Sequence, residues 1–197
     1  MIDTKQKILD AAEQLIAGQG YAATSLRQII TSAGVNLAAI HYHFGSKEEL
    51  LDELVRRKAV PVNEKRLEIL DRYAAEAGGG PVPIEKVLDA FLTPMAEAAT
   101  RQPQFVRVMG RVIVEGLLPA VIQKNFQPVL NRFIGALREG LPHLSASEFQ
   151  WRIQFMIGAM AHTMCGTIEQ DGDFGTRIAR LIVFLSAGFR APATEGK

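Results

Sequence analysis

Apolar residues recur at helical spacing along most of the chain, and no stretch shows the period of two that marks a half-buried strand. Near the N-terminus, residues 4–17 carry one apolar stripe that ends at Gly18 and Gly20. The stripe consists of Ile8, Leu9, Ala12, Leu15 and Ile16. This spacing predicts an amphipathic helix whose apolar side closes a small helical core.

Two short helices joined by a glycine turn are predicted for the segment that follows. The first begins at Thr24 or Ser25, and Gln28 completes a capping box with Ser25. Gly34 can leave this helix with a positive φ at little cost, and Asn36 is a good cap for the second helix. A turn of three or four residues that contains glycine is the signature of a helix-turn-helix unit, whose second helix enters the major groove of DNA.

The second helix of this unit has one apolar face and one face suited to DNA. Ile40 and Phe44 lie four residues apart and predict the buried side, which should pack against Ile29 and the N-terminal stripe. On the other side, small side chains let the backbone approach the groove, and N–H and O–H groups can contact phosphates or base edges. The outward residues are Ala38, Ala39, His41 and Tyr42, and the donors come from His41, Tyr42 and His43. An ordinary surface turn with the same residues is the alternative, but the caps and the upstream helix favour DNA binding.

A second capping box, formed by Ser46 and Glu49, begins the next helix at Lys47. The positive end of the helix dipole and the lysine together predict a phosphate anchor at this corner. The net charge of the whole chain is only +1, but no Asp or Glu lies between Glu13 and Glu48. The predicted DNA face is therefore free of carboxylates that would repel phosphates.

The segment from Ile8 to Leu51 resembles the DNA-binding domain of the TetR/AcrR family, on the motifs ILDAAEQLIAGQGYAATSLRQI, AGV, HYHF and GSKEELL. The resemblance implies an all-helical homodimeric regulator, in most members a repressor, whose larger C-terminal domain binds a small molecule that weakens DNA binding. It also carries DNA contacts over to Thr24, Ser25, Arg27, Asn36, Leu37, Ala38, Ala39, His41, Tyr42, His43 and Lys47. The sequence departs from the family at His41, where tyrosine is common, and the contact made there stays open.

We expect an all-α chain of three parts. These are a helix-turn-helix DNA-binding domain over residues 1–46, a connecting helix over 47–77, and a helical bundle over 78–197 for ligand binding and dimerisation. The segment GGGPVP at 78–83 is the only clear loop-rich linker. Pro61 should kink or break the connecting helix, because proline removes one backbone N–H and clashes with the preceding turn.

Five helices are predicted beyond the linker. They cover residues 84–100, 105–116, 119–140, 145–168 and 174–189. Pro94 should interrupt the first of them and Pro128 should bend the third. The last two helices are apolar nearly all round and need partners on two sides, so we expect a homodimer through an isologous four-helix interface. A thick monomeric core is the alternative.

The C-terminal part also has the residues of an adaptable apolar cavity, because five of the six methionines lie at or after Met95. The candidate pocket residues are Phe91, Met95, Phe105, Met109, Arg111, Ile113, Phe126, Phe133, Met160, His162 and Met164. Arg111 or His162 would supply a polar handle, whereas plain core is the alternative for the whole set. The motifs FQWRIQFMIGAMAHTMCG and FLSAGFRA resemble the subgroup that includes fatty-acid-responsive regulators, which implies a hydrophobic, acyl-like effector.

An enzyme, a metal site and a cofactor find little support. His41 and His43 are two residues apart, which places them on different faces of a helix. Cys165 lies one turn after His162, but in an apolar helix where an inert, buried thiol is expected. No glycine-rich phosphate loop or nucleophile elbow appears.

The remaining expectations concern location and partners. A single cysteine suits a reducing compartment, and no leader or bilayer-length apolar run is present, so we expect a cytoplasmic protein without membrane contact. Its partner would be a palindromic DNA operator. The second alternative is a DNA-binding regulator without a ligand, whose helical domain only dimerises.

Overall fold

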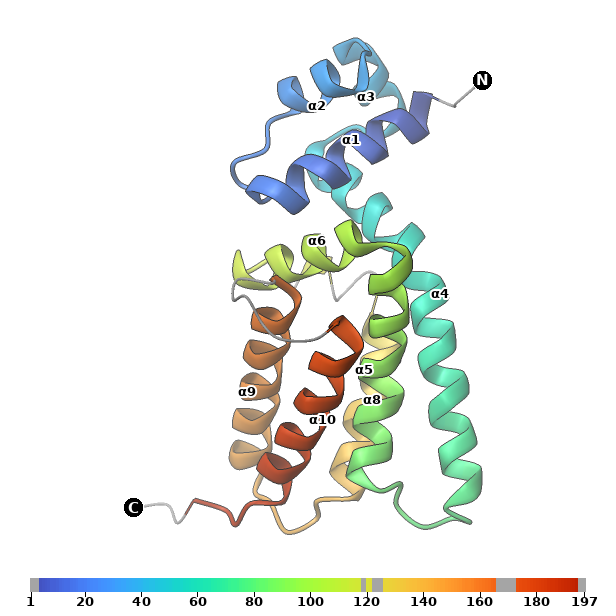
Figure 1. Ribbon diagram of the computed structural model, residues 1–197, viewed down its shortest axis with the longest axis vertical. Helices are drawn as coiled ribbons and strands as arrows, with labels where there is room; N and C mark the ends of the chain where they lie inside the picture. Colours follow the sequence, from blue (N-terminus) through green and yellow to red (C-terminus); the bar gives the residue numbers. More distant parts are fainter. Residues whose placement is uncertain (1–3, 118–119, 122–125, 166–172, 195–197) are drawn as a thin grey trace.

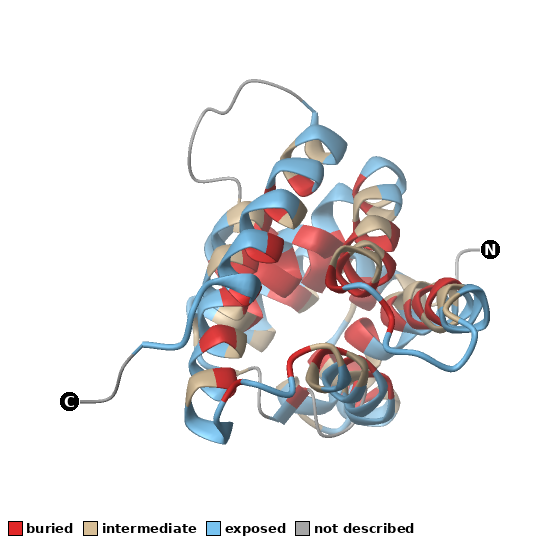
Figure 2. Cartoon of the chain, turned by 90° about the horizontal axis from the view of Figure 1, so that it is seen from below, coloured by how far each residue is buried: buried red, intermediate tan, exposed pale blue. Residues whose placement is uncertain are grey.

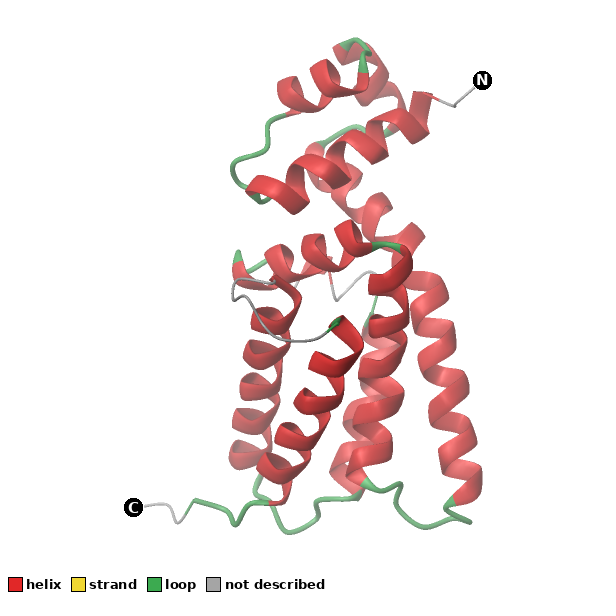
Figure 3. Cartoon of the chain, in the orientation of Figure 1, coloured by secondary structure: helices red, strands yellow, loops and turns green. Residues whose placement is uncertain are grey.

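The computed structural model describes residues 4–117, 120–121, 126–165 and 173–194, and all regular structure in these ranges is helical (Figure 3). The helices are α1 (Thr4–Gln19), α2 (Leu26–Ala33), α3 (Leu37–His43), α4 (Lys47–Glu76), α5 (Ile84–Arg101), α6 (Pro103–Val114), α8 (Gln127–Glu139), α9 (Ala146–Cys165) and α10 (Phe174–Arg190). The predicted all-α fold class is confirmed.

The helices form two bodies stacked along the long axis of the molecule (Figure 1). Helices α1, α2 and α3 make the small upper body, and α5, α8, α9 and α10 run lengthwise in the larger lower one. Helix α6 crosses between the two bodies, where it packs against both α1 and α9. Helix α4 starts in the upper body and continues to the far end of the lower one.

The upper body has the core that the apolar spacing predicts. Ile8, Ile29 and Ile40 are completely buried, and Phe44 is nearly so. These four side chains come from α1, α2, α3 and the residue that ends α3. Burial of each such side chain contributes about 1.5–3 kcal/mol, and these contacts join the three short helices.

Local hydrogen bonds set the ends of these helices as the sequence indicates. The Ser25 hydroxyl accepts from the Gln28 N–H at 3.2 Å, and the Gln28 side chain accepts from the Ser25 N–H at 2.7 Å. Gly34 ends α2 in the left-handed conformation, with φ 64° and ψ 37°. Asn36 caps α3 by accepting from Ala39 N–H at 2.9 Å. The predicted helix-turn-helix geometry is confirmed.

The predicted interruption at Pro94 was wrong, and Pro61 does not break its helix. Pro61 lies inside α4 and Pro94 inside α5, and both helices continue through the proline. A proline removes one backbone hydrogen bond, but the packed neighbours on both sides keep each helix in place.

The predicted helix over 119–140 is not one continuous helix, because residue 126 lies in a turn although residues 120–121 are helical. The described helix α8 begins at Gln127, and Pro128 lies in its first turn, where the missing N–H costs nothing. The predicted bend at Pro128 was therefore wrong. Residues 118–119, 122–125 and 166–172 lie outside the described residues, as do the predicted end of the 145–168 helix and most of the turn at 171–173.

The lower body has a continuous apolar interior. Figure 2 looks up from below and shows buried residues on the sides of the helices that turn inward. Arg152 ties the start of α9 to the end of α10, because its guanidinium donates to four carbonyl groups there. The acceptors are the carbonyl oxygens of Gly188, Phe189, Ala191 and Pro192. Glu148 neutralises this buried arginine at 2.8 Å.

Replacement of Gly34 by alanine should lower the free energy of unfolding by about 1 kcal/mol, because a side chain disfavours the left-handed conformation. A Cβ at Gly34 meets no atom within 4 Å, so the cost comes from the backbone alone. Gly135 in α8 also has open space around it, and Gly135→Ala should stabilise the helix by about 0.5–1 kcal/mol. Urea unfolding followed by circular dichroism measures both variants, and equal effects would contradict the turn geometry.

Candidate functional site

Helices α2 and α3 lie at the end of the molecule remote from the lower body (Figure 1). The Tyr42 side chain is 87% exposed and Leu37 is 47% exposed. Other predicted contact residues with exposed side chains are Ser25, Arg27, Asn36, Ala38 and His41. Ala39 and His43 are half-buried, and the Tyr42 and His43 rings meet edge to face with centroids 5.0 Å apart.

His41 has a local hydrogen bond that limits its contact with DNA. Its Nδ1 atom lies 3.0 Å from the Gly45 carbonyl oxygen. A carbonyl oxygen only accepts, so Nδ1 donates to it and Nε2 is the ring nitrogen left for DNA. In the neutral form of the ring Nε2 is an acceptor, which suits the amino group of a base better than a phosphate oxygen.

Thr24 does not belong to this exposed surface. Its side chain is 1% exposed, and its hydroxyl donates to the Gly20 carbonyl at 2.6 Å and accepts from Gln19 at 3.3 Å. The hydroxyl therefore holds the α1–α2 loop, and we remove Thr24 from the predicted DNA contacts.

Lys47 is also turned away from the role predicted for it. Its ammonium group donates to the Tyr21 carbonyl at 2.6 Å and lies 3.9 Å from the centroid of the Tyr21 ring. Burial lowers the pKa of Lys47, despite the nearby Glu48 and Glu115 carboxylates. The lysine thus fixes the start of α4 to the α1–α2 loop. Its side chain is therefore not available for the phosphate contact predicted at this corner.

The same loop is held from the other body by Glu115, which follows α6. Its carboxylate accepts from the Tyr21 N–H at 2.9 Å and from the Ala22 N–H at 2.8 Å. Gly20 makes this approach possible, because a Cβ there would lie 2.3 Å from the carboxylate oxygen, and its φ is 91°. Arg111 adds a bond from α6 to the Gly18 carbonyl at 3.3 Å.

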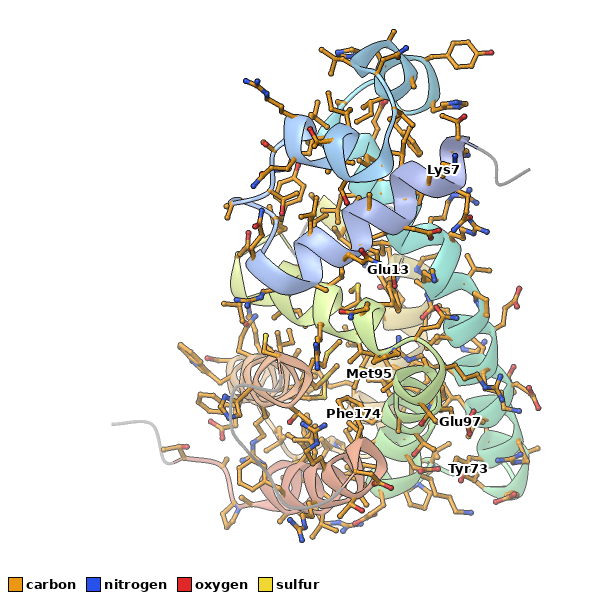
Figure 4. All side chains as sticks on the ribbon, turned by 45° about the horizontal axis from the view of Figure 1, so that its top comes forward. Lys7, Glu13, Tyr73, Met95, Glu97 and Phe174 are labelled. Atoms are coloured by element: carbon orange, nitrogen blue, oxygen red, sulfur yellow. The ribbon has the colours of Figure 1, made fainter. Side chains whose placement is uncertain are left out.

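Two further contacts stabilise the junction of the two bodies. The Tyr21 hydroxyl donates to Glu48 at 3.1 Å, and burial and this carboxylate raise the pKa of Tyr21 to about 12. Glu13, labelled under α1 in Figure 4, pairs with Lys58 of α4 at 3.4 Å. The end of α6, the start of α4 and the α1–α2 loop therefore form one connected junction.

An apolar cavity of about 270 Å³ lies in the lower body, between α4, α5, α6, α8 and α9. It is lined by Ala59, Val62, Arg66, Phe91, Met95, Ala98, Phe105, Val106, Met109, Ile113, Phe126, Gln127, Leu130, Ile134, Ile153, Met156, Ile157, Met160 and Met164. Eight of the eleven predicted pocket residues are in this lining, among them Met95, which Figure 4 labels on α5. The cavity lies just below the range of about 300–1,000 Å³ that is usual for ligand pockets.

Three of the predicted pocket residues lie elsewhere. Phe133 packs against the Phe91 ring at 5.0 Å and lines a smaller neighbouring hollow. Arg111 bonds to the α1–α2 loop, and His162 is exposed, so neither is the polar handle of the cavity.

Sequence reasoning missed Arg66, the charged residue among the described residues of the lining. Arg66 is 5% exposed, and it lies on α4 between Val62 and Ile69, at the helical spacing of the buried stripe. That position, a charge inside an apolar stripe, was the signal that could have found it.

An apolar face remains uncovered on the outside of α9 and α10. Phe155 is 66% exposed, and Trp151 stacks beside it with ring centroids 6.0 Å apart. Val183 and Phe184 of α10 are 71% and 68% exposed. By contrast Met156, Met160 and Met164 of α9 are buried and line the cavity.

Within the described ranges, no group of three or more His, Cys, Asp or Glu side chains could hold a metal ion. None of the described helices has the length and apolar character needed to cross a membrane. Burial raises the pKa of Cys165, which does not favour a reactive thiolate.

Comparison with known proteins gives matches over both bodies. Residues 8–54 match the family model of bacterial regulatory proteins of the tetR family, and residues 88–188 match the tetracyclin repressor-like C-terminal domain. The chain is 37% identical over 82 residues to the helix-turn-helix regulator AcrR of Shigella flexneri, which covers 42% of this chain and 36% of AcrR. It is 29% identical over 171 residues to a helix-turn-helix transcriptional repressor of Mycobacterium tuberculosis, which covers 84% of this chain and 79% of that protein.

A solved structure shows the same fold over the whole chain. The fatty acid degradation regulator FadR of Bacillus halodurans superimposes with a TM-score of 0.59, covering 98% of this chain and 99% of FadR. At 19% sequence identity this likeness concerns the fold alone.

Replacement of Glu115 by alanine should loosen the α1–α2 loop, because two backbone N–H groups lose a carboxylate acceptor. Hydrogen bonds to charged groups contribute about 1.5–3 kcal/mol, so amide exchange at Tyr21 and Ala22 should accelerate about tenfold or more. Hydrogen exchange followed by nuclear magnetic resonance measures this. Glu139→Ala, at the exposed end of α8, is the matched control, and unchanged protection at Tyr21 would show that the Glu115 contact is not made in solution.

Proposed function

This chain belongs to the tetR family of helix-turn-helix transcriptional regulators. From that premise we propose that it is a repressor that binds a palindromic operator as a homodimer. We propose further that a small hydrophobic effector releases it from DNA. The proposal has three parts, which are DNA contact by α2 and α3, dimerisation by α9 and α10, and ligand control through the cavity.

For DNA contact, we assign the exposed surface of the helix-turn-helix unit. Helix α3 enters the major groove, where the small Ala38 lets the backbone approach and Tyr42 and His41 reach phosphate or base edges. Ser25 and Arg27 lie at the start of α2 and contact the adjoining backbone. The contact set is Ser25, Arg27, Asn36, Leu37, Ala38, Ala39, His41, Tyr42 and His43. With so few cations, helix N-termini carry much of the phosphate contact.

For dimerisation, the uncovered apolar face on α9 and α10 supports an isologous four-helix interface. Trp151, Phe155, Val183 and Phe184 are large apolar side chains that remain exposed on one chain. Exposed aromatic residues of this kind mark protein interfaces. In a dimer with a two-fold axis, the same apolar face of the two copies would pack together. The spacing of the two recognition helices then sets which operator can be bound.

For ligand control, one observation carries the proposal: α6 lines the cavity at one side and holds the DNA-binding body at its end. Phe105, Met109 and Ile113 of α6 are cavity residues, and Glu115 directly follows the helix and bonds to the α1–α2 loop. Helix α4 makes a second route, because it lines the cavity at Arg66 and begins beside α3 at Lys47. A ligand that shifts either helix changes the distance between the two recognition helices away from the roughly 34–36 Å of successive major grooves.

The proposed organisation of the chain is a DNA-binding domain over 1–46, a connecting helix over 47–77 and a sensing and dimerising domain over 78–197. The effector is hydrophobic and acyl-like, in keeping with a cavity walled by methionine and phenylalanine. The second candidate, a regulator without a ligand, would have a filled lower body, and the cavity of about 270 Å³ favours the ligand-controlled function.

Selection of duplex DNA by the purified chain tests the proposed function. The recovered sequences should contain two inverted half-sites about one helical turn apart or a multiple of it, and sequences without dyad symmetry would contradict the homodimeric mode. On the recovered site, Tyr42→Ala should weaken binding about tenfold, because it removes one phosphate or base contact. Thr24→Ser keeps the structural hydroxyl and should bind like the natural protein. Unchanged affinity of Tyr42→Ala would remove this residue from the contact set.

Replacement of Phe184 by glutamate should convert the dimer to a monomer, because it places two carboxylates near the two-fold axis. Loss of an aromatic anchor from the centre of an interface costs about 2 kcal/mol or more, which raises the dimer dissociation constant at least about thirtyfold. Sedimentation velocity at micromolar concentration measures this. Val60→Glu changes an exposed apolar residue of α4 in the same way and should leave the dimer intact. A natural chain that sediments as a monomer would overturn this part of the proposal.

A further inference from the structure

Among the described residues that line the cavity, all but two are apolar, and one of these two is charged. Arg66 lies in the middle of α4 and is 5% exposed, and Gln127 is the other polar residue of the lining. Removal of a guanidinium from water is strongly unfavourable unless a counter-charge replaces the lost hydration. The buried guanidinium of Arg66 therefore requires a counter-charge.

The described residues around Arg66 offer only neutral partners. Nε donates to the Phe91 carbonyl at 2.8 Å, and Nη1 donates to the Asn63 side-chain oxygen at 3.0 Å. The guanidinium carbon lies 4.1 Å from the centroid of the Phe91 ring. A guanidinium has five N–H donors, and these bonds from described residues use two of them.

The charge of Arg66 persists in this environment. Burial lowers the pKa of Arg66 to about 10, which still leaves the side chain cationic at neutral pH. No carboxylate of the described ranges pairs with it, and within the same ranges no residue accepts from Nη2. A positive charge with unused donors therefore borders an apolar cavity.

The other buried arginine of the described residues, Arg152, has a different set of partners. Arg152 is buried to the same degree, with 7% of its surface exposed. It pairs with Glu148 at 2.8 Å and donates to four carbonyl groups, and it is not a cavity residue. Arg152 therefore has the counter-charge and acceptors of a structural arginine, whereas Arg66 has a neutral clamp on one side and a cavity on the other.

We propose that the cavity binds an amphipathic carboxylate, whose apolar chain lies among the methionine and phenylalanine side chains and whose anionic group pairs with Arg66. This inference rests on the proposed function, in which the cavity is the effector site. A carboxylate matches the planar fork of a guanidinium and supplies the counter-charge that the described residues do not. The Phe91 carbonyl and Asn63 hold the guanidinium in position before the ligand arrives, so little conformational entropy is lost on binding.

Isothermal titration of the full chain with decanoate and with 1-decanol tests this, because the two probes share a chain length and differ in charge. Decanoate should bind at least about tenfold more tightly than decanol, as charge-assisted pairing predicts. Arg66→Met keeps the apolar volume and should lose this preference, with decanol binding unchanged or improved. Arg72→Met, which removes an exposed arginine from the same helix, should keep it.

A third variant separates the two levels of the proposal. Met160→Trp fills the cavity, and this variant should bind neither decanoate nor decanol. If decanol binds as tightly as decanoate and Met160→Trp abolishes both, the cavity is the ligand site and the role of Arg66 is wrong. If neither probe binds, the proposed ligand control fails together with this inference. If Arg66→Met does not fold, Arg66→Lys is used instead, because it keeps the positive charge but lacks the planar guanidinium. This variant should retain a reduced preference for decanoate over decanol. Loss of all preference in Arg66→Lys would overturn the proposed pairing.

Discussion

The arrangement of the whole chain depends on one helix, α6, that is buried on two sides. Val108 and Val112 of this short helix are completely inaccessible to solvent. Helix α9 comes so close that a Cβ on Gly110 would lie 2.9 Å from the Cys165 sulfur and 3.0 Å from its backbone nitrogen. Helix α1 covers the opposite side (Figure 1). Because the two bodies share this layer, a displacement of α6 acts on both.

The two sides of α6 differ in chemistry, and the difference suits a sensor. Its lower side forms part of an apolar cavity wall, where contacts are numerous and individually weak. At its end Glu115 makes two directional, charge-assisted bonds to the α1–α2 loop, and Gly20 leaves room for them. Such bonds contribute about 1.5–3 kcal/mol each, which is the size of a typical allosteric coupling of about 1–3 kcal/mol. In the proposed mechanism, loss or gain of this contact is therefore enough to change operator affinity.

The sequence predicted the N-terminal body almost element by element, because the interactions that define it are local. The Ser25 capping box, the left-handed Gly34 and the Asn36 cap each involve residues no more than six positions apart. The helix boundaries follow from such local chemistry, and helical periodicity then identifies Ile40 as core. Most of the predicted pocket residues line the cavity for a related reason, since large flexible apolar residues on amphipathic helices face one interior.

The α1–α2 loop, which engages two of the misplaced residues, is held by a contact between residues far apart in the chain. Tyr21 and Glu115 are 94 positions apart, and no local rule indicates that a carboxylate from α6 organises the loop in which Thr24 and Lys47 are engaged. The helical prolines were misjudged for the same reason, because tertiary packing outweighed an intrinsic preference. Arg66 differs from both cases. The apolar stripe of α4 that contains Arg66 is visible in the sequence. An arginine among charged neighbours is nevertheless expected to be exposed to solvent, until the packing of α4 shows which side of the helix faces inward. Where an apolar stripe contains a charge and the described residues supply only neutral partners for it, the missing counter-charge is itself information about the ligand.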